Sequence, residues 1–288
     1  MKVDAADPTP VSPPTPTAAR VFAVTSGKGG VGKTNVVANL AAALSGAGRR
    51  VMVVDADLGL ANLDLFLGIR PTYTLADFFA GTRPLADVIV NGRHGITLLP
   101  AASGVPEVTA LSEEQKIVFL TELDALTHDV DLVLVDTGSG ISDTVTYFAT
   151  AAQEIVVVVT PEPSSLTDAY ALVKVLARRH QEKRFWILAN GVDGAPQAQQ
   201  VYDVLSRTAL RFLNASMDLL GWIPRDPELE RAVARSQLVL TASPGSPSAR
   251  ALSSIASRLD RFSREATYVK GSPQFFFRRI LAAGGQTQ

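Results

Sequence analysis

One glycine-rich segment, Gly27-Lys28-Gly29-Gly30-Val31-Gly32-Lys33-Thr34, constrains the fold of this chain more than any other. It fits the spacing of a phosphate-binding P-loop. Such a loop follows a buried strand and opens a helix, and here residues 21–25 are apolar while residues 36–47 have a helical pattern. Glycines let backbone N–H groups turn toward an anion, and the helix N-terminus adds partial positive charge. The segment therefore predicts an α/β fold that binds phosphate after its first strand.

Short β-branched runs alternate with helical patterns along the rest of the chain, which is typical of a parallel sheet with helices on both faces. The predicted strands are residues 21–25, 50–55, 95–100, 132–136, 154–160, 184–190 and 219–223; the predicted helices are 36–47, 113–127, 142–152, 166–180, 197–212 and 227–235. Composition does not shift within this region, so we predict one P-loop NTPase-type domain at 21–262. Residues 1–20, rich in proline and threonine, are predicted to be a flexible tail, and residues 263–288 a basic linker and terminal helix.

Composition excludes several classes of protein. The 288 residues contain no cysteine, so disulfides, thiolate zinc sites, Cys-ligated iron–sulfur clusters and cysteine nucleophiles are excluded. Lys plus Arg total 27 against 28 Asp plus Glu, which argues against nucleic-acid binding by bulk charge. The strongly apolar stretch 155–159 is far shorter than the roughly 20 residues of a membrane span, and the N-terminus lacks the pattern of a secretory signal. We therefore expect a cytoplasmic protein with no direct nucleic-acid partner.

The P-loop residue types indicate specific contacts. Lys33 is expected to reach the β- and γ-phosphates, and the Thr34 hydroxyl to ligate Mg²⁺. The sequence assigns nucleotide binding to Gly27, Lys28, Gly29, Gly30, Val31, Gly32, Lys33, Thr34 and Asn35.

Carboxylates follow two later strands at the edge where open α/β sheets bind ligands. Asp55 and Asp57 end the apolar run that starts at Val51, and Asp136 follows four apolar residues as in a Walker B strand. Asp136 is expected to hold Mg²⁺ through water, and Gly138 and Gly140 to let the next loop follow the γ-phosphate. A strand-ending aspartate is also a common helix cap, but the P-loop favours the nucleotide interpretation.

Lys28 is not required by an ordinary P-loop. With it, Lys28-Gly29-Gly30-Val31-Gly32-Lys33-Thr34 resembles the deviant Walker A motif of the MinD/ParA ATPases. The resemblance implies ATP/ADP and Mg²⁺ as ligands and an ATP-dependent homodimer, in which Lys28 crosses to the partner's phosphates. It also implies that Asp57 places the attacking water and that Asp55 supports Mg²⁺. The implied catalytic residues are Lys28, Lys33, Asp57 and Asp136.

The same resemblance implies contacts farther along the chain. Asn190 matches the asparagine that reads adenine in this family, and Pro224 with Asp226 matches a loop that lies against the base. Glu162 resembles a residue that reaches across the dimer to the other nucleotide. Asparagine and Pro-x-Asp are also common in turns, so turn formation is the alternative interpretation for Asn190, Pro224 and Asp226.

The sequence of residues 272–284 predicts a separate helix. Ser272 can cap it, Pro273 suits its first position and Gly284 can end it. At about 100° per residue, one face carries four apolar side chains: Phe276, Phe277, Ile280 and Leu281. The pattern favours an interfacial helix in an anionic leaflet, similar to the membrane-targeting tail of MinD-type proteins, and the alternative is a helix folded onto the domain's own groove. We expect the protein to be peripheral on the inner membrane when ATP-bound, because dimerisation doubles the anchors.

Residues 57–68 and 73–77 look most like the FlhG (YlxH, FleN) branch, which sets the number and position of flagella. That branch implies the FlhF GTPase, flagellar switch-complex proteins or a flagellar transcription regulator as partners. Residues 1–20 contain nothing like the Asp-Gln-Ala-x-x-Leu-Arg element with which many FlhG proteins stimulate FlhF. A MinD-type division-site ATPase is the nearest alternative, and a ParA-type DNA or cargo partitioning ATPase is a weaker one because the basic residues cluster beside the aromatic helix.

Overall fold

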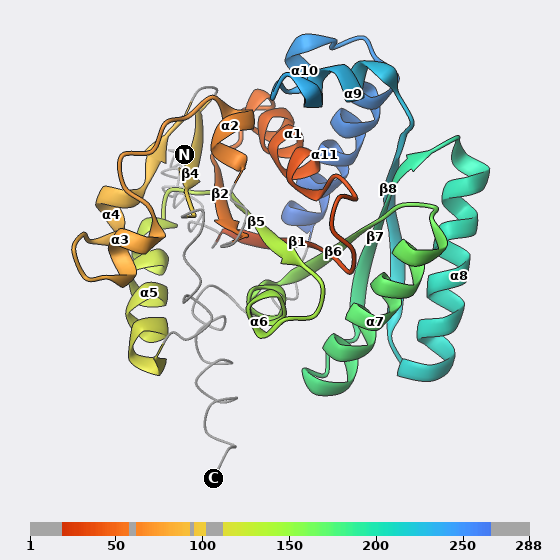
Figure 1. Ribbon diagram of the computed structural model, residues 1–288, viewed down its shortest axis with the longest axis horizontal. Helices are drawn as coiled ribbons and strands as arrows, with labels where there is room; N and C mark the ends of the chain where they lie inside the picture. Colours follow the sequence, from red (N-terminus) through yellow and green to blue (C-terminus); the bar gives the residue numbers. More distant parts are fainter. Residues whose placement is uncertain (1–18, 58–61, 93–94, 102–111, 266–288) are drawn as a thin grey trace, which may run out of the picture.

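The computed structural model describes residues 19–57, 62–92, 95–101 and 112–265. These residues form an eight-stranded sheet in the order β3-β4-β2-β5-β1-β6-β7-β8 (Figure 1). The strands are β1 Arg20–Ser26, β2 Val51–Ala56, β3 Val90–Asn91, β4 Ile96–Leu99, β5 Leu132–Ser139, β6 Glu154–Val159, β7 Arg184–Val192 and β8 Ser216–Pro224. Neighbouring strands are parallel except β3 with β4. The predicted mostly parallel α/β sheet is confirmed.

Helices cover both faces of the sheet (Figure 1). One face packs against α1, α2, α9, α10 and α11, and the other against α3 to α8. The helices are α1 Lys33–Gly46, α2 Leu63–Leu67, α3 Leu75–Phe79, α4 Leu85–Val88, α5 Glu113–Leu126, α6 Asp143–Ala151, α7 Pro163–Arg179, α8 Ala195–Leu213, α9 Pro227–Ala234, α10 Val239–Ala242 and α11 Pro247–Glu265.

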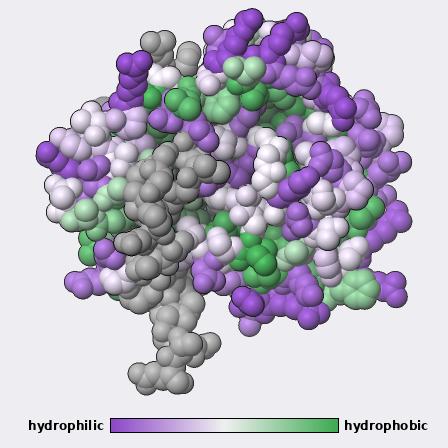
Figure 2. Space-filling model, in the orientation of Figure 1, coloured by the Kyte–Doolittle hydropathy of each residue, from purple (hydrophilic) through white to green (hydrophobic). Residues whose placement is uncertain are grey.

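The core follows from the period-two alternation of the strands. In β1, Phe22 and Val24 pack on the side of α1 and α11, while Val21 and Ala23 pack on the opposite side. All four are at most 7% exposed, so β1 is buried on both faces, as its continuous apolar run predicts. Hydrophilic residues dominate the face shown in Figure 2, where hydrophobic residues form only small patches.

Several elements were not predicted. The strand β3 and the helices α2, α3, α4 and α10 have two to five residues each, too short for a periodic pattern. The long α11 is rich in serine and arginine, but its buried Leu252, Ile255, Ala256 and Leu259 recur at helical spacing and could have revealed it.

Some sequence predictions lie outside the described residues. They include the tail before residue 19 and the terminal helix with Phe276, Phe277, Ile280 and Leu281. Within the described ranges, no helix is long and apolar enough to cross a membrane.

Candidate nucleotide site

The topology brings the predicted site residues to one edge of the sheet. β5 lies between β1 and β2, with Asp55 opposite Asp136 in the register of β2 and β5 and Ser26 opposite Ser139 in that of β1 and β5. The P-loop leaves the end of β1 and enters α1 at Lys33. Because parallel strands all end at the same edge, the P-loop and both carboxylate strands meet there.

Two glycines of the P-loop occupy positions that another residue would disturb. A Cβ on Gly27 would lie 2.1 Å from the backbone carbon and oxygen of Asp168 in α7. Gly32 has φ of +88°, in the left-handed region, and a Cβ there would lie 2.5 Å from Nδ2 of Asn190. The loop is therefore packed between α7 and the end of β7, and glycine permits both close approaches.

A buried cluster of charges lies under the loop. The Lys33 ammonium is 2.6 Å from Oδ1 of Asp136 and 3.9 Å from a carboxylate oxygen of Asp57. The side chains of Lys33 and Asp136 are 7% and 1% exposed, and that of Asp57 is 25% exposed. The second oxygen of Asp136 is buried and has no hydrogen-bond partner in the described part of the chain. This oxygen can accept a water or a cation.

Burial raises the pKa values of two carboxyl groups here, those of Asp55 and Asp136. Burial, with the negative charge of Asp136, raises the pKa of Asp55 to about 8. Burial also raises the pKa of Asp136, against the opposing effects of Lys33 and the Thr34 side chain. Two neighbouring carboxyl groups that are costly to ionise are what a divalent cation would stabilise.

The donor set fits Mg²⁺. Thr34, Asp55 and Asp136 offer hydroxyl and carboxylate oxygens, the hard ligands that this ion prefers. Among the described residues, no group of three or more His, Cys, Asp or Glu side chains could hold a metal alone. This agrees with Mg²⁺, which usually binds one or two carboxylates together with waters and phosphates.

The two residues expected to act across a dimer contact each other within one chain. The Lys28 ammonium lies 2.6 Å from Oε2 of Glu162 and donates to the Ser164 hydroxyl at 2.9 Å. The side chains of Lys28 and Glu162 are 36% and 62% exposed. Lys28 holds the pKa of Glu162 below its usual range. The contact joins the P-loop to the start of α7 at the surface, where either side chain can exchange partners.

The residues expected at the base contact the protein itself. Asn190 donates from Nδ2 to the backbone oxygen of Val31 at 2.8 Å and so lies on the P-loop. Asp226 caps α9 by accepting from the Glu228 N–H at 2.9 Å, and its other oxygen accepts from the Ser248 N–H and hydroxyl at 3.0 and 2.6 Å. Pro224 ends β8. Adenine binding by Asn190, Pro224 and Asp226 stays a prediction.

Sequence reasoning missed three polar residues that support the site. They are Ser164, which binds Lys28, Ser248, which binds Asp226, and Asn39, which is fully buried in α1 and donates to the Asn35 carbonyl at 2.9 Å. The Asn39 side chain also accepts from the N–H of Leu240 in α10. Asn39 could have been found from the sequence, because it is a polar residue within the apolar run of α1.

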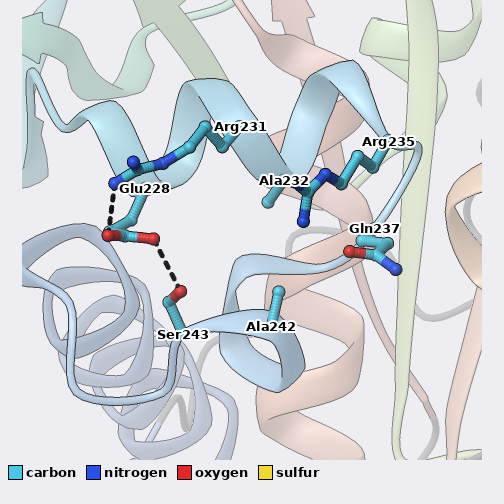
Figure 3. A pocket seen from close by; sticks show the side chains of 7 residues that line it. All are labelled: Glu228, Arg231, Ala232, Arg235, Gln237, Ala242 and Ser243. Atoms are coloured by element: carbon cyan, nitrogen blue, oxygen red, sulfur yellow. Dashed lines mark hydrogen bonds and ion pairs between the residues drawn. The ribbon is translucent and has the colours of Figure 1, made fainter.

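A separate cavity of about 420 Å³ lies between α9 and α10 (Figure 3). It is lined by Glu228, Arg231, Ala232, Arg235, Gln237, Ala242 and Ser243. Glu228 pairs with Arg231 and accepts from the Ser243 hydroxyl at 2.9 Å, so its carboxylate is already partnered. None of the predicted nucleotide residues lines this cavity, and the charged cluster at the P-loop is the stronger candidate site.

A parallel sheet with this loop between β1 and α1 defines a P-loop nucleotide-binding protein. The CobQ/CobB/MinD/ParA nucleotide binding domain matches residues 22–239, and the chain belongs to that family. The antiactivator FleN of Pseudomonas aeruginosa is 42% identical over 262 residues, which are 91% of this chain and 93% of FleN. The flagellum site-determining protein YlxH of Helicobacter pylori is 32% identical over 268 residues, 91% of this chain and 90% of YlxH. The septum site-determining protein MinD of Pyrococcus horikoshii, solved with Mg-ADP, is similar with a TM-score of 0.68 and 27% identity, covering 87% of this chain and 100% of that one.

Proposed function

We propose that this protein is a Mg²⁺-dependent ATPase switch of the FleN/FlhG type, which dimerises with ATP, binds the inner membrane and controls the number or placement of flagella. The charged cluster of Lys33, Asp57 and Asp136 beneath a glycine-constrained P-loop carries the proposal. The similarity to FleN and YlxH, which covers 91% of the chain in each case, supports the flagellar role.

In the proposed reaction, the P-loop N–H groups and the start of α1 bind the phosphates of ATP. Lys33 exchanges its contact with Asp136 for phosphate oxygens and neutralises their charge. Asp136, Asp55 and the Thr34 hydroxyl would hold Mg²⁺, which would supply further charge neutralisation when bound. Asp57, the most exposed of the three carboxylates, orients the attacking water.

Dimerisation completes the site in this proposal. Lys28 leaves Glu162 and Ser164 and reaches the nucleotide of the partner protomer, and Glu162 is then free to make its own contact across the interface. The ion pair is exposed to solvent and therefore weak, so the exchange costs little. Hydrolysis removes the shared phosphate contacts and returns the protein to monomers, which bind the membrane through one terminal helix instead of two.

Size-exclusion chromatography with light scattering tests the switch. Asp57→Ala should form a dimer with ATP and Mg²⁺ and hydrolyse ATP at least about 100-fold more slowly than wild type. Lys28→Ala should stay monomeric. Asp203→Ala removes an exposed carboxylate from α8 and should behave as wild type. An Asp57→Ala protein that is monomeric at saturating ATP contradicts the proposal.

Co-sedimentation with anionic vesicles, with and without residues 272–288, tests the membrane anchor. Equal binding by the two proteins would refute it.

The alternative function is a MinD-type division-site ATPase, which the similarity to septum site-determining MinD favours. A deletion strain separates the two, because altered flagellar number supports the flagellar role and minicells support the division role.

A further inference from the structure

Arginine side chains surround an aromatic pair where β7 begins and α11 ends. The rings of Trp186 and Phe262 have centroids 4.6 Å apart. The Arg184 guanidinium lies 4.9 Å from the Trp186 ring centroid, and that of Arg258 lies 5.6 Å from the Phe262 ring centroid. Arg258 also donates to the carbonyl of Leu220 at 3.0 Å. These contacts bring charges from β7 and α11 together at one place on the surface.

The end of α11 carries two further exposed arginines, Arg261 and Arg264. We call the four residues Arg184, Arg258, Arg261 and Arg264 the α11-end basic surface. Trp186 is only 3% exposed, so the surface presents guanidinium groups and not an inserting indole.

Acidic neighbours neutralise part of this charge. Arg184 lies 3.4 Å from Asp218, and Arg264 lies 2.8 Å from Asp260, which also binds Arg49 at 2.7 Å. Among the side chains that the structure describes, which do not include that of Glu265, none forms an ion pair with Arg258 or Arg261. The surface is therefore net positive, although the whole chain has a net charge of −1.

The surface lies far from the nucleotide edge and at the last described residues of the chain. α11 starts beside Asp226, whose carboxylate binds Ser248, and its 19 residues span about 28 Å. Residue 266 follows directly, and the remaining sequence carries Lys270 and two more arginines beside its phenylalanines.

We propose that the α11-end basic surface binds the headgroups of anionic phospholipids and so orients the folded domain on the bilayer. The proposal rests on the proposed function, in which the terminal helix enters the same leaflet. Because the surface is at the opposite end of α11 from Asp226, the nucleotide edge stays accessible to the second protomer. The basic residues act through charge at the headgroups, while the helix acts through apolar burial.

The test compares two double variants of the full-length chain that remove the same charge. Arg261→Gln with Arg264→Gln removes one arginine with no ion pair to a described side chain and one that pairs with Asp260, four residues before it. Arg231→Gln with Arg235→Gln makes the matched change on α9, where Arg231 pairs with Glu228 (Figure 3). Binding to phosphatidylglycerol/phosphatidylcholine vesicles is measured by co-sedimentation with ATP and Mg²⁺ at about 0.1 M salt, where the Debye length is about 10 Å.

The α11 variant should bind vesicles roughly 25-fold more weakly, at about fivefold for each arginine, and the loss should shrink near 1 M salt. The α9 variant should stay within about twofold of wild type. Both should dimerise with ATP as wild type does in the absence of vesicles. Equal losses in the two variants, or no loss in the α11 variant, overturn the proposal.

Two further experiments distinguish failure of this proposal from failure of the proposed membrane anchor, and lipid binding from nucleic-acid binding. Phe276→Ser with Phe277→Ser tests the terminal helix; if that variant still binds vesicles while the α11 variant does not, the anchor fails and the basic surface stands. If the wild-type chain does not bind vesicles, both fail. Loss of binding to duplex DNA by the α11 variant, with unchanged vesicle binding, would identify a nucleic-acid surface and overturn the lipid assignment.

Discussion

The buried pair of Lys33 and Asp136 gives the sharpest prediction about the ligand-free protein. Lys33→Met keeps the length of the side chain but leaves Asp136, 1% exposed, without its cation. Removing one partner of a buried ion pair costs about 3–5 kcal/mol, because the other charge remains buried. For a domain of this size, about 1 kcal/mol shifts the Tm by roughly 2–4 °C. The variant should therefore melt roughly 6–20 °C below wild type without nucleotide or Mg²⁺.

Differential scanning calorimetry measures the loss, and a double-mutant cycle assigns it. Asp136→Asn in the Lys33→Met background removes the orphaned charge, so the combined loss should be smaller than the sum of the single losses by on the order of 2 kcal/mol. Lys174→Met, at an exposed position on α7, should change stability by no more than about 0.5 kcal/mol. A Lys33→Met protein that melts within about 2 °C of wild type, or additive losses in the cycle, would refute the reasoning.

The remaining predictions concern the loop, a cap and the metal. Gly27→Ala places a methyl group against the Asp168 backbone, so the P-loop must shift and ATP affinity measured by calorimetry should fall at least about tenfold. Burial opposes the ionisation of Asp226, but hydrogen bonds from Ser248 hold its pKa below the usual value. The ionised Asp226 side chain therefore stabilises the fold at pH values above its unfolded-state pKa, and this stabilisation is lost as the pH falls through its folded-state pKa. Asp226→Asn should lower the free energy of unfolding, measured in urea, by about 1.5–3 kcal/mol at pH 7 and by less below about pH 4. Mg²⁺ alone should leave the Tm almost unchanged, whereas Mg²⁺ with ATP should raise it by several degrees, because the described residues include no group of three or more His, Cys, Asp or Glu that could hold the ion without phosphate ligands.

Residues 21–25 and 132–136 show why the centre of the fold was predictable. Each is a continuous apolar run that ends in a polar turn, and burial on both faces leaves no other placement for it. The P-loop then indicated the edge of the sheet at which ligands bind. Asp55 and Asp136 could therefore be predicted to lie together at that edge without knowledge of the strand register.

The parts that were missed depend on contacts between distant residues. The short α10 is held by a hydrogen bond from the Leu240 N–H to Asn39 in α1, 201 residues away, which no local pattern signals. Asp226 illustrates the same limit, because Pro-x-Asp at a strand end suits both a base contact and a helix cap. The partner of its second oxygen, Ser248, lies 22 residues later in a helix that was not predicted.

Packing also indicates how hydrolysis would release a nucleotide switch of this kind from the membrane. α1 and α11 share a buried core that includes Leu40, Leu44 and Leu252, and Arg49 binds Asp260 at 2.7 Å, so the two helices should move as one body. In contrast, the loop after β5 has Ile141 52% exposed, and it follows a carboxylate of the charged cluster by only a few residues. Such a loop can reorganise at low cost when phosphate contacts change. In the proposed cycle, hydrolysis therefore acts first on the contact with the second protomer, and release from the membrane follows from the loss of one anchor instead of a movement of α11.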